Sequence, residues 1–219
     1  MDEESFLTLA APGDAETRVR GSSFLALAAP ASDEATARAV VEERERAMWD
    51  ASHHCYAWRL RGGLWRAADA GEPSGSAGAP ILAAIEGAGL LDCVVVVTRY
   101  FGGTKLGVGG LVRAYGEAAA LALDAAPRRR AIPALRLRIR YPYEHTSAVM
   151  RSLERAEAEE VEHGYAAGGR EGEIEFTVPR VRESLLHDLL RDATAGALTA
   201  ELLEERTLYR PDRGYKSPV

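Results

Sequence analysis

Cysteine is scarce in this chain of 219 residues, and long hydrophobic runs are missing. The two cysteines, Cys55 and Cys93, are too few for a disulfide framework or a four-thiolate zinc site. No apolar run has the length of a membrane span. The acidic N-terminus also lacks the basic start of a secretory signal peptide. We therefore expect a cytoplasmic protein with no membrane contact.

Positive charge is also in short supply, and it is unevenly spread. The formal net charge is −6, which excludes a generically basic nucleic-acid binder. Residues 51–131 nevertheless carry 9 basic and 6 acidic side chains, so this glycine-rich middle segment has a positive balance. The hydrophobic content of 47% and the charged content of 27% are typical of a globular protein. We therefore expect any site for an anionic ligand to lie in the middle segment.

The middle segment joins a buried strand to a helix through a glycine-rich turn. The four valines at 94–97 predict a fully buried strand, and an Ala/Leu-rich helix follows. Its expected apolar stripe consists of Leu111, Val112, Tyr115, Ala118, Ala119 and Ala122. Such a turn directs backbone N–H groups and the positive end of the helix dipole toward an anion. Arg99 and Lys105 add positive charge beside it. Glycines of the turn are Gly102, Gly103, Gly107, Gly109 and Gly110.

Neither of the two familiar glycine motifs for phosphate fits this turn. A P-loop needs a glycine before its lysine and Ser or Thr after it, but Lys105 lies between Thr104 and Leu106. The dinucleotide fingerprint, counted from Gly107, would need a glycine where Val112 stands. Two interpretations stay open: an anion-binding turn, or glycines that only permit tight turns and close helix packing.

Residues 51–60, ASHHCYAWRL, predict a strand. Its His-His-Cys run suggests either metal ligands or a cysteine nucleophile. A period of two places His53 and Cys55 on one face and His54 on the other. Adjacent histidines on a strand point to opposite faces, so we expect no metal site here. Cys55 as a nucleophile with His53 as its base is one hypothesis. The alternative is a partly buried strand whose polar groups are hydrogen-bonded.

The segment DAGEPSGSAGAP, residues 69–80, predicts an irregular loop because it is rich in glycine, proline and serine. Its two carboxylates belong to Asp69 and Glu72. A carboxylate pair is able to perform acid–base chemistry. The interpretation that we favour is that these carboxylates cap turns or pair with Arg99.

Further elements follow from hydrophobic periodicity and turn residues. In the first half we expect strands over 6–10, 17–28 and 64–68, a helix that begins at Ser32 or Asp33 and ends near 49, and a helix over 80–88.

Residues 126–133, APRRRAIP, predict a linker. In the second half we expect strands over 135–141, 161–167, 173–178 and 198–203 and helices over 146–158 and 179–191. That order, βαββαβ, is ferredoxin-like. Its histidines, His145, His163 and His187, are isolated, so it offers no catalytic constellation.

Three blocks of the first half resemble the signature of the YigZ/IMPACT family, in the family's order and spacing. They are HHCYAW at 53–58, DAGEPSGSAGAP at 69–80 and RYFGGTKLGVGGLVRAYG at 99–116. The resemblance implies an N-terminal domain like domain IV of elongation factor G and a ribosomal small-subunit protein. It also implies a C-terminal domain like domain V of elongation factor G. We therefore expect an α+β protein with an IMPACT-type domain over 1–127, a ferredoxin-like domain over 133–208 and a flexible tail over 209–219.

The resemblance also implies a function, because eukaryotic relatives regulate translation. We expect a non-enzymatic binding protein linked to translation regulation, with RNA, ribosome-associated factors or a phosphate-bearing ligand as partner. No catalytic residue, metal or cofactor is assigned. Among the aromatic residues of the third block, Tyr100, Phe101 and Tyr115 are able to stack on bases, although core packing is favoured for at least two of them. The candidate binding residues are His53, His54, Asp69, Glu72, Arg99, Lys105, Gly109, Gly110 and Arg113.

An enzyme that acts on a phosphorylated or nucleotide-like small molecule is the alternative. Its site would gather His53, Asp69, Glu72, Arg99 and Lys105 around the glycine turn. The shape of the site distinguishes the two hypotheses. An enclosed cavity lined by His53, Glu72 and Arg99 favours chemistry, and an open basic face favours RNA or protein.

Overall fold

The structure, a computed structural model, describes residues 5–166 and 168–212. Its contacts divide the chain into two compact units, with Phe6–Arg130 in one and Ala131–Arg210 in the other. Each unit combines helices with a largely antiparallel sheet, so the expected α+β class is confirmed. Within the described residues, no helix is long and apolar enough to cross a membrane.

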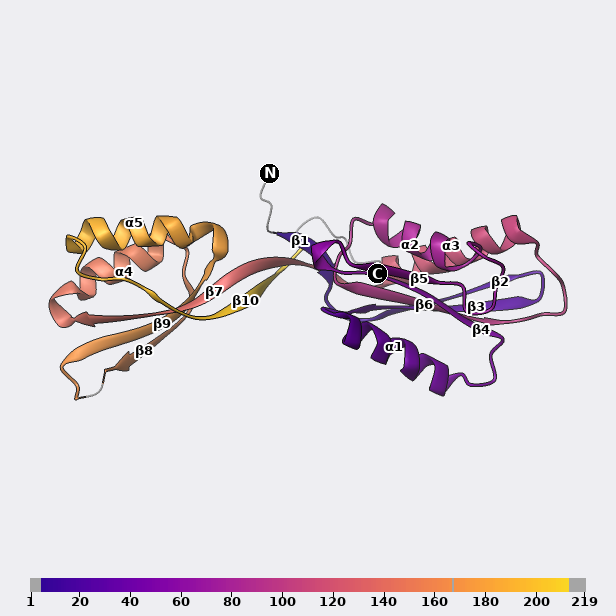
Figure 1. Ribbon diagram of the computed structural model, residues 1–219, viewed down its shortest axis with the longest axis horizontal. Helices are drawn as coiled ribbons and strands as arrows, with labels where there is room; N and C mark the ends of the chain where they lie inside the picture. Colours follow the sequence, from indigo (N-terminus) through magenta and orange to yellow (C-terminus); the bar gives the residue numbers. More distant parts are fainter. Residues whose placement is uncertain (1–4, 167, 213–219) are drawn as a thin grey trace. The chain divides into compact units, whose positions relative to one another are not determined.

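The first unit is a five-stranded sheet with helices on both faces (Figure 1). Its strand order is β2-β3-β6-β4-β5. One face packs against α1, and the other packs against α2 and α3. The strands are β2 (Gly13–Val19), β3 (Ser22–Pro30), β4 (His53–Arg59), β5 (Trp65–Ala68) and β6 (Cys93–Tyr100). The helices are α1 (Glu34–Ala47), α2 (Gly78–Gly87) and α3 (Val108–Ala125).

Strand β6 is the centre of this sheet, because it pairs with both β3 and β4. Its four valines are completely buried, as their sequence predicts. Val95 and Val97 join the core under α2 and α3, whereas Val94 and Val96 join the core under α1. A strand buried on both faces explains why the run shows no polar alternation.

Two expectations for the first unit are wrong. Residues 17–28 form a hairpin of β2 and β3 rather than one strand, with a two-residue turn at Arg20 and Gly21. Both turn residues have positive φ, 47° and 84°, which suits the twist of a tight hairpin. On α3, Val112 is 37% exposed and lies off the buried stripe. The first unit also contains β1 (Phe6–Leu9) and the short 3-10 turn η1 (Arg61–Gly63).

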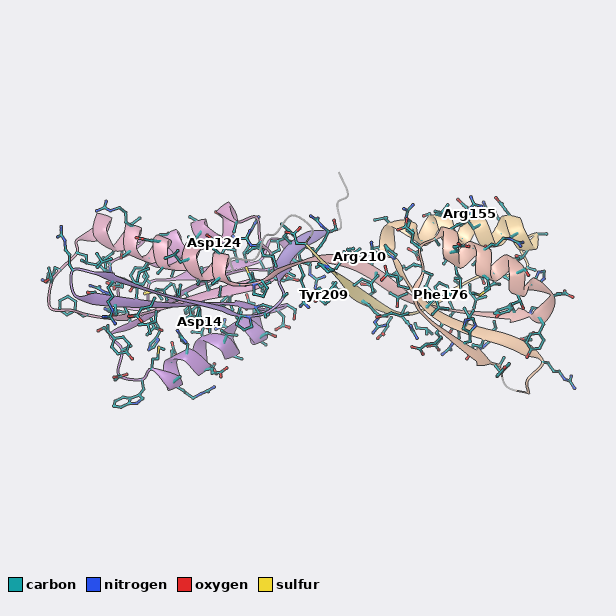
Figure 2. The ribbon with its side chains drawn as sticks, turned by 180° about the vertical axis from the view of Figure 1, so that it is seen from behind. Asp14, Asp124, Arg155, Phe176, Tyr209 and Arg210 are labelled. Carbon is teal, nitrogen blue, oxygen red and sulfur yellow. The ribbon has the colours of Figure 1, made fainter. Side chains whose placement is uncertain are left out.

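The second unit has the expected ferredoxin-like order β7, α4, β8, β9, α5, β10. In its sheet, β7 lies between β10 and β9, and β8 follows β9. The fully buried Phe176 lies on this sheet beneath the two helices (Figure 2). The elements are β7 (Arg128–Pro142), η2 (Tyr143–His145), α4 (Thr146–Arg155), β8 (Glu159–Tyr165), β9 (Glu171–Pro179), η3 (Arg180–Arg182), α5 (Glu183–Thr194) and β10 (Glu201–Pro211).

The expected linker over 126–133 is largely strand, because β7 begins at Arg128. Proline and the residue before it favour extended backbone, so a proline-flanked basic stretch suits a long strand as well as a linker. The boundary between the two units lies inside β7, between Arg130 and Ala131. Of the tail expected over 209–219, residues 209–211 are strand and 213–219 lie outside the described residues.

Candidate functional site

The candidate site lies in the first unit, where β6 ends and α3 begins. Register brings its residues together: Arg99 on β6 faces His53 on β4 and Phe24 on β3 as a direct neighbour. Glu72 comes from the loop between β5 and α2, and Tyr115 comes from the second turn of α3. Separate segments therefore contribute to one polar cluster at the end of the central strand.

A buried ion pair between Arg99 and Glu72 forms the centre of the cluster. The Nη1 atom of Arg99 donates to Glu72 Oε1 at 2.6 Å, and both side chains are about 5% exposed or less. The hydroxyl of Tyr115 donates to the same oxygen at 2.7 Å, and burial raises the pKa of this phenol. Arg99 Nη2 donates to Ser22 Oγ at 3.3 Å. A buried pair of opposite charges is retained only with such supporting hydrogen bonds.

Two aromatic rings enclose the Arg99 guanidinium. Its Cζ lies 5.4 Å from the ring centre of the buried Phe24 and 5.4 Å from that of Phe101. The Nε atom of Arg99 is buried without a hydrogen-bond partner in the described part of the chain. Attraction between a cation and aromatic faces offsets part of that loss. Phe101 is 49% exposed, so one of the two rings also faces solvent.

A pocket of about 340 Å³ opens beside this cluster. Its wall is mostly apolar and carries three charged side chains, with this lining: Glu72, Pro73, Arg99, Phe101, Lys105, Leu106, Gly107, Val108 and Leu111. Lys105 is exposed, and His53 is not part of the wall. The pocket is therefore an apolar recess with an exposed ammonium group, open to solvent beside Phe101.

The N-terminus of α3 forms one side of the pocket. Gly107 precedes the helix with φ of 69°, and within the described residues no side chain caps this end. The first hydrogen bond of the helix runs from Leu111 N to Gly107 O at 3.0 Å. The N–H groups before it have no carbonyl partner within the helix, and they carry the positive end of its dipole.

Asp69 has a structural role, as the favoured interpretation predicts. Its carboxylate accepts hydrogen bonds from the backbone N–H groups of Gly75, Ala77 and Gly78 at 2.8–2.9 Å. Burial acts to raise the pKa of Asp69, but these three donors outweigh it and the pKa is lowered. The aspartate therefore holds the loop against the start of α2. The predicted pairing of Glu72 with Arg99 is confirmed as well.

The histidine and cysteine of β4 are held by neighbouring backbone and side-chain groups. His53 Nδ1 lies 3.0 Å from Ala70 O, and its Nε2 lies 3.9 Å from Glu72 Oε1. Cys55 donates to Asp69 O, and burial raises the pKa of its thiol to about 12. The thiol is then protonated at neutral pH, which disfavours the nucleophile hypothesis.

His54 lies on the opposite face of β4, as the period of two predicts. Its Nδ1 is 3.0 Å from Thr98 Oγ1, and burial lowers the pKa of the imidazole. The structure therefore does not bring His54 together with the other candidate binding residues. Within residues 5–166 and 168–212, no group of three or more His, Cys, Asp or Glu is placed to hold a metal ion.

Gly109, Gly110 and Arg113 lie in the first two turns of α3. Gly110 and Arg113 line a second pocket of about 290 Å³ that shares Leu106 with the first, so the two pockets are adjacent. Gly109 has helical backbone, and an added Cβ would meet only Arg113 Nη1, at 3.8 Å.

The glycine with the tightest surroundings is Gly102, in the loop that follows β6. A Cβ on Gly102 would lie 1.9 Å from the carbonyl carbon of Gly21, in the β2–β3 turn. Ser22 Oγ also accepts a hydrogen bond from Gly102 N at 3.1 Å. The hairpin turn and the glycine loop are therefore in direct backbone contact.

Sequence reasoning missed Ser22 and part of the pocket wall: Pro73, Leu106, Val108 and Leu111. No local signal marks Ser22, which lies 77 residues from its partner Arg99. The apolar wall residues are ordinary in composition and become notable only through their position. The expectation that at least two of the three aromatic residues considered for stacking pack in the core is wrong. Tyr115 alone of the three is buried in the core, Tyr100 is half-buried with its hydroxyl donating to Asp50 Oδ1 at 2.9 Å, and Phe101 is half exposed.

Comparisons with known proteins agree with this architecture. The Impact N-terminal domain model matches residues 20–123. The IMPACT family member in the pol 5′ region of Thermus thermophilus is 45% identical over 139 residues, 64% of this chain and 74% of that protein. The IMPACT family member YigZ of Escherichia coli strain K12 is 30% identical over 207 residues, 92% of this chain and all of that protein.

One solved structure, titled a hypothetical protein, superimposes with a TM-score of 0.64 at 30% identity. The match covers 92% of this chain and 98% of that one, so the likeness extends over both units. With 45% identity to one family member and full-length coverage of another, this chain belongs to the IMPACT family.

Proposed function

We propose that this chain is a non-enzymatic binding protein that contacts single-stranded RNA and serves in translation regulation. One observation carries the RNA part of the proposal: the half-exposed ring of Phe101, the ammonium group of Lys105 and the uncapped N-terminus of α3 share one pocket. Single-stranded nucleic acids bind by stacking bases on aromatic rings while cations and N–H groups contact the phosphates. The pocket offers both kinds of contact side by side.

The charges around the pocket divide into structural and accessible ones. Glu72 neutralises Arg99, so we assign this guanidinium to contact with the Phe101 ring and not to the phosphate contact that its sequence position suggests. Lys105 and the helix N-terminus supply the accessible positive potential. The exposed Arg20 and Arg113 line the adjacent pocket with one carboxylate, Glu117, so the net charge of its wall is also positive. A strand of several nucleotides therefore has a path to follow.

The placement of His53, Cys55 and Asp69 favours binding over catalysis, and the carboxylate of Glu72 is held by Arg99 and Tyr115. Asp69 is occupied by three backbone donors, and Cys55 is a buried, protonated thiol. His53 contacts a backbone carbonyl and lies outside the pocket wall. General acid–base catalysis needs a titrating group within hydrogen-bond reach of the substrate. Among these three residues, none meets that condition.

Fluorescence anisotropy with a short labelled single-stranded RNA tests the proposal. We expect salt-sensitive binding that weakens at least about fivefold in Phe101→Ala, because stacking on one ring stabilises a base by about 1–3 kcal/mol. Lys105→Ala is expected to weaken binding and to flatten the dependence of affinity on salt. Trp49→Ala, which removes an aromatic side chain that is 83% exposed just after the end of α1 and outside the pocket wall, is the matched control. Absence of binding at low salt would contradict the proposal.

A further inference from the structure

The wall of the pocket contains a buried carboxylate with one oxygen to spare. Both hydrogen bonds to the Glu72 carboxylate, from Arg99 and from Tyr115, end on Oε1. The contact with His53 Nε2 is also made to Oε1, at 3.9 Å. In the described part of the chain, no hydrogen bond ends on Oε2. The side chain is 4% exposed and lines the pocket, so Oε2 is the carboxylate oxygen left to accept from a ligand there.

The position of this oxygen is set in advance. Arg99 and Tyr115 hold the other oxygen from two sides, and two rings fix the guanidinium of Arg99 in turn. A preorganised acceptor loses little freedom when a ligand binds, so its contact contributes fully to selectivity. A carboxylate that faces an apolar recess also favours a ligand able to donate, because an unmatched polar group is costly there.

The rest of the wall fits a flat aromatic group. Phe101, Pro73, Leu106, Val108 and Leu111 provide the apolar surface. A volume of about 340 Å³ is at the small end of the range for ligand pockets, which suits a single base more than a large ligand. Phe101 and Glu72 line the same pocket, so a base held there is within reach of both side chains.

The four RNA bases differ in how that edge suits an ionised carboxylate, which only accepts hydrogen bonds. Guanine carries two adjacent donors, N1–H and the 2-amino group. Adenine and cytosine place an acceptor nitrogen beside their amino group, and uracil places a carbonyl on each side of its N3–H. Their lone pairs repel a carboxylate that approaches the neighbouring donor.

We infer that this pocket, if it binds single-stranded RNA as proposed above, selects guanine, with the base in contact with Phe101 and its N1–H and 2-amino group both donating to Glu72 Oε2, which has two lone pairs. The inference thus names the base that the proposed RNA site prefers. It assigns Glu72 two tasks: one oxygen holds Arg99 and Tyr115 in place, and the other recognises the ligand.

Changing the ligand tests this inference on the unaltered full chain. The probes are labelled oligouridine 8-mers in which one central position is uridine, guanosine, adenosine, cytidine, inosine or 1-methylguanosine. We expect guanosine to bind about tenfold more tightly than the other three standard bases, the selectivity of a good pair of hydrogen bonds. Inosine, which lacks the 2-amino group, should fall between guanosine and uridine. The 1-methylguanosine probe, whose N1 cannot donate, should lose most of the gain.

Each outcome separates the inference from the proposed function. Equal binding of all the probes would overturn the guanine preference and leave RNA binding intact, and no binding of any probe would overturn both. Equal affinity for guanosine and 1-methylguanosine would also overturn the role of Glu72. In a second arm, Glu72→Gln should abolish the preference, whereas Glu86→Gln, the same charge change at an exposed position of α2, should keep it. Glu72→Gln removes the partner of a buried guanidinium and so destabilises the fold. If this variant does not fold, the probe series on the unaltered chain decides the test by itself.

Discussion

Breaking the Arg99–Glu72 ion pair should destabilise the first unit far more than the removal of an exposed charged side chain does. Both side chains are about 5% exposed or less, and the bond between them measures 2.6 Å. Removing one partner from such a pair leaves an uncompensated buried charge, at a cost of about 3–5 kcal/mol. We therefore expect Arg99→Met and Glu72→Gln each to lower the free energy of unfolding by about this amount.

The double variant gives the sharper result. With both charges removed, the penalty of an unpaired buried charge disappears, and the amide oxygen introduced by Glu72→Gln still accepts from Tyr115. We expect the double variant to be about 2 kcal/mol more stable than the sum of the single effects predicts. Lys105→Ala, an exposed position in the same pocket, should stay within about 0.5 kcal/mol of the unaltered chain.

Urea unfolding followed by tryptophan fluorescence measures these free energies for the relevant unit. All three tryptophans, Trp49, Trp58 and Trp65, lie between Phe6 and Arg130, so the signal reports on the first unit. If Arg99→Met costs less than about 1 kcal/mol and the two substitutions are additive, the pair does not support the fold. Arg99 would then be free to act as a ligand contact.

Three further results follow from the same region. Gly102→Ala should destabilise the first unit by several kcal/mol, because its Cβ would lie 1.9 Å from the carbonyl carbon of Gly21. Gly109→Ala should stabilise the unit by about 0.5–1 kcal/mol, because this position in the first turn of α3 has room for a Cβ. Urea unfolding measures both free energies. Asp69→Ala should cost about 1–2 kcal/mol at pH 7, as the loss of a helix cap does. Folding lowers the pKa of Asp69, so the stability that this carboxylate contributes is present above the ordinary value of 3.8 and is lost as pH falls through the lower pKa of the folded state. The unfolding curves of the variant and the unaltered chain should therefore converge below pH 3.8. Cys55 and Cys93, each with a thiol pKa raised by burial to about 12, should resist a thiol reagent at pH 8 and react only after unfolding; rapid labelling of the folded chain would contradict this.

The sequence predicted local features of the site well, because local rules govern them. A period of two separated His53 from His54 on β4, and the valine run identified the central strand. The residues of the loop before α2 were enough to favour capping by Asp69 and pairing by Glu72.

Features that depend on distant partners were missed. Nothing near Ser22 indicates that its hydroxyl accepts from an arginine on another strand. The turn at Arg20 and Gly21 lacks the Asn-Gly or Asp-Gly pair that usually marks a tight hairpin, so β2 and β3 merged into one expected strand. The arginines at 128–130 were interpreted by composition as a linker, whereas strand pairing places them in β7.

The contact between Gly21 and Gly102 restricts where this protein tolerates insertions. Hairpin tips are ordinarily among the most permissive positions for added residues. Here the tip of the β2–β3 hairpin lies against the loop that follows Phe101, and Ser22 bonds to that loop. Any peptide tag or fluorescent reporter placed at this tip would displace this loop and the Phe101 ring next to it. A better graft point is the turn at η1, where Gly62 and Gly63 have nothing within 4 Å of an added Cβ.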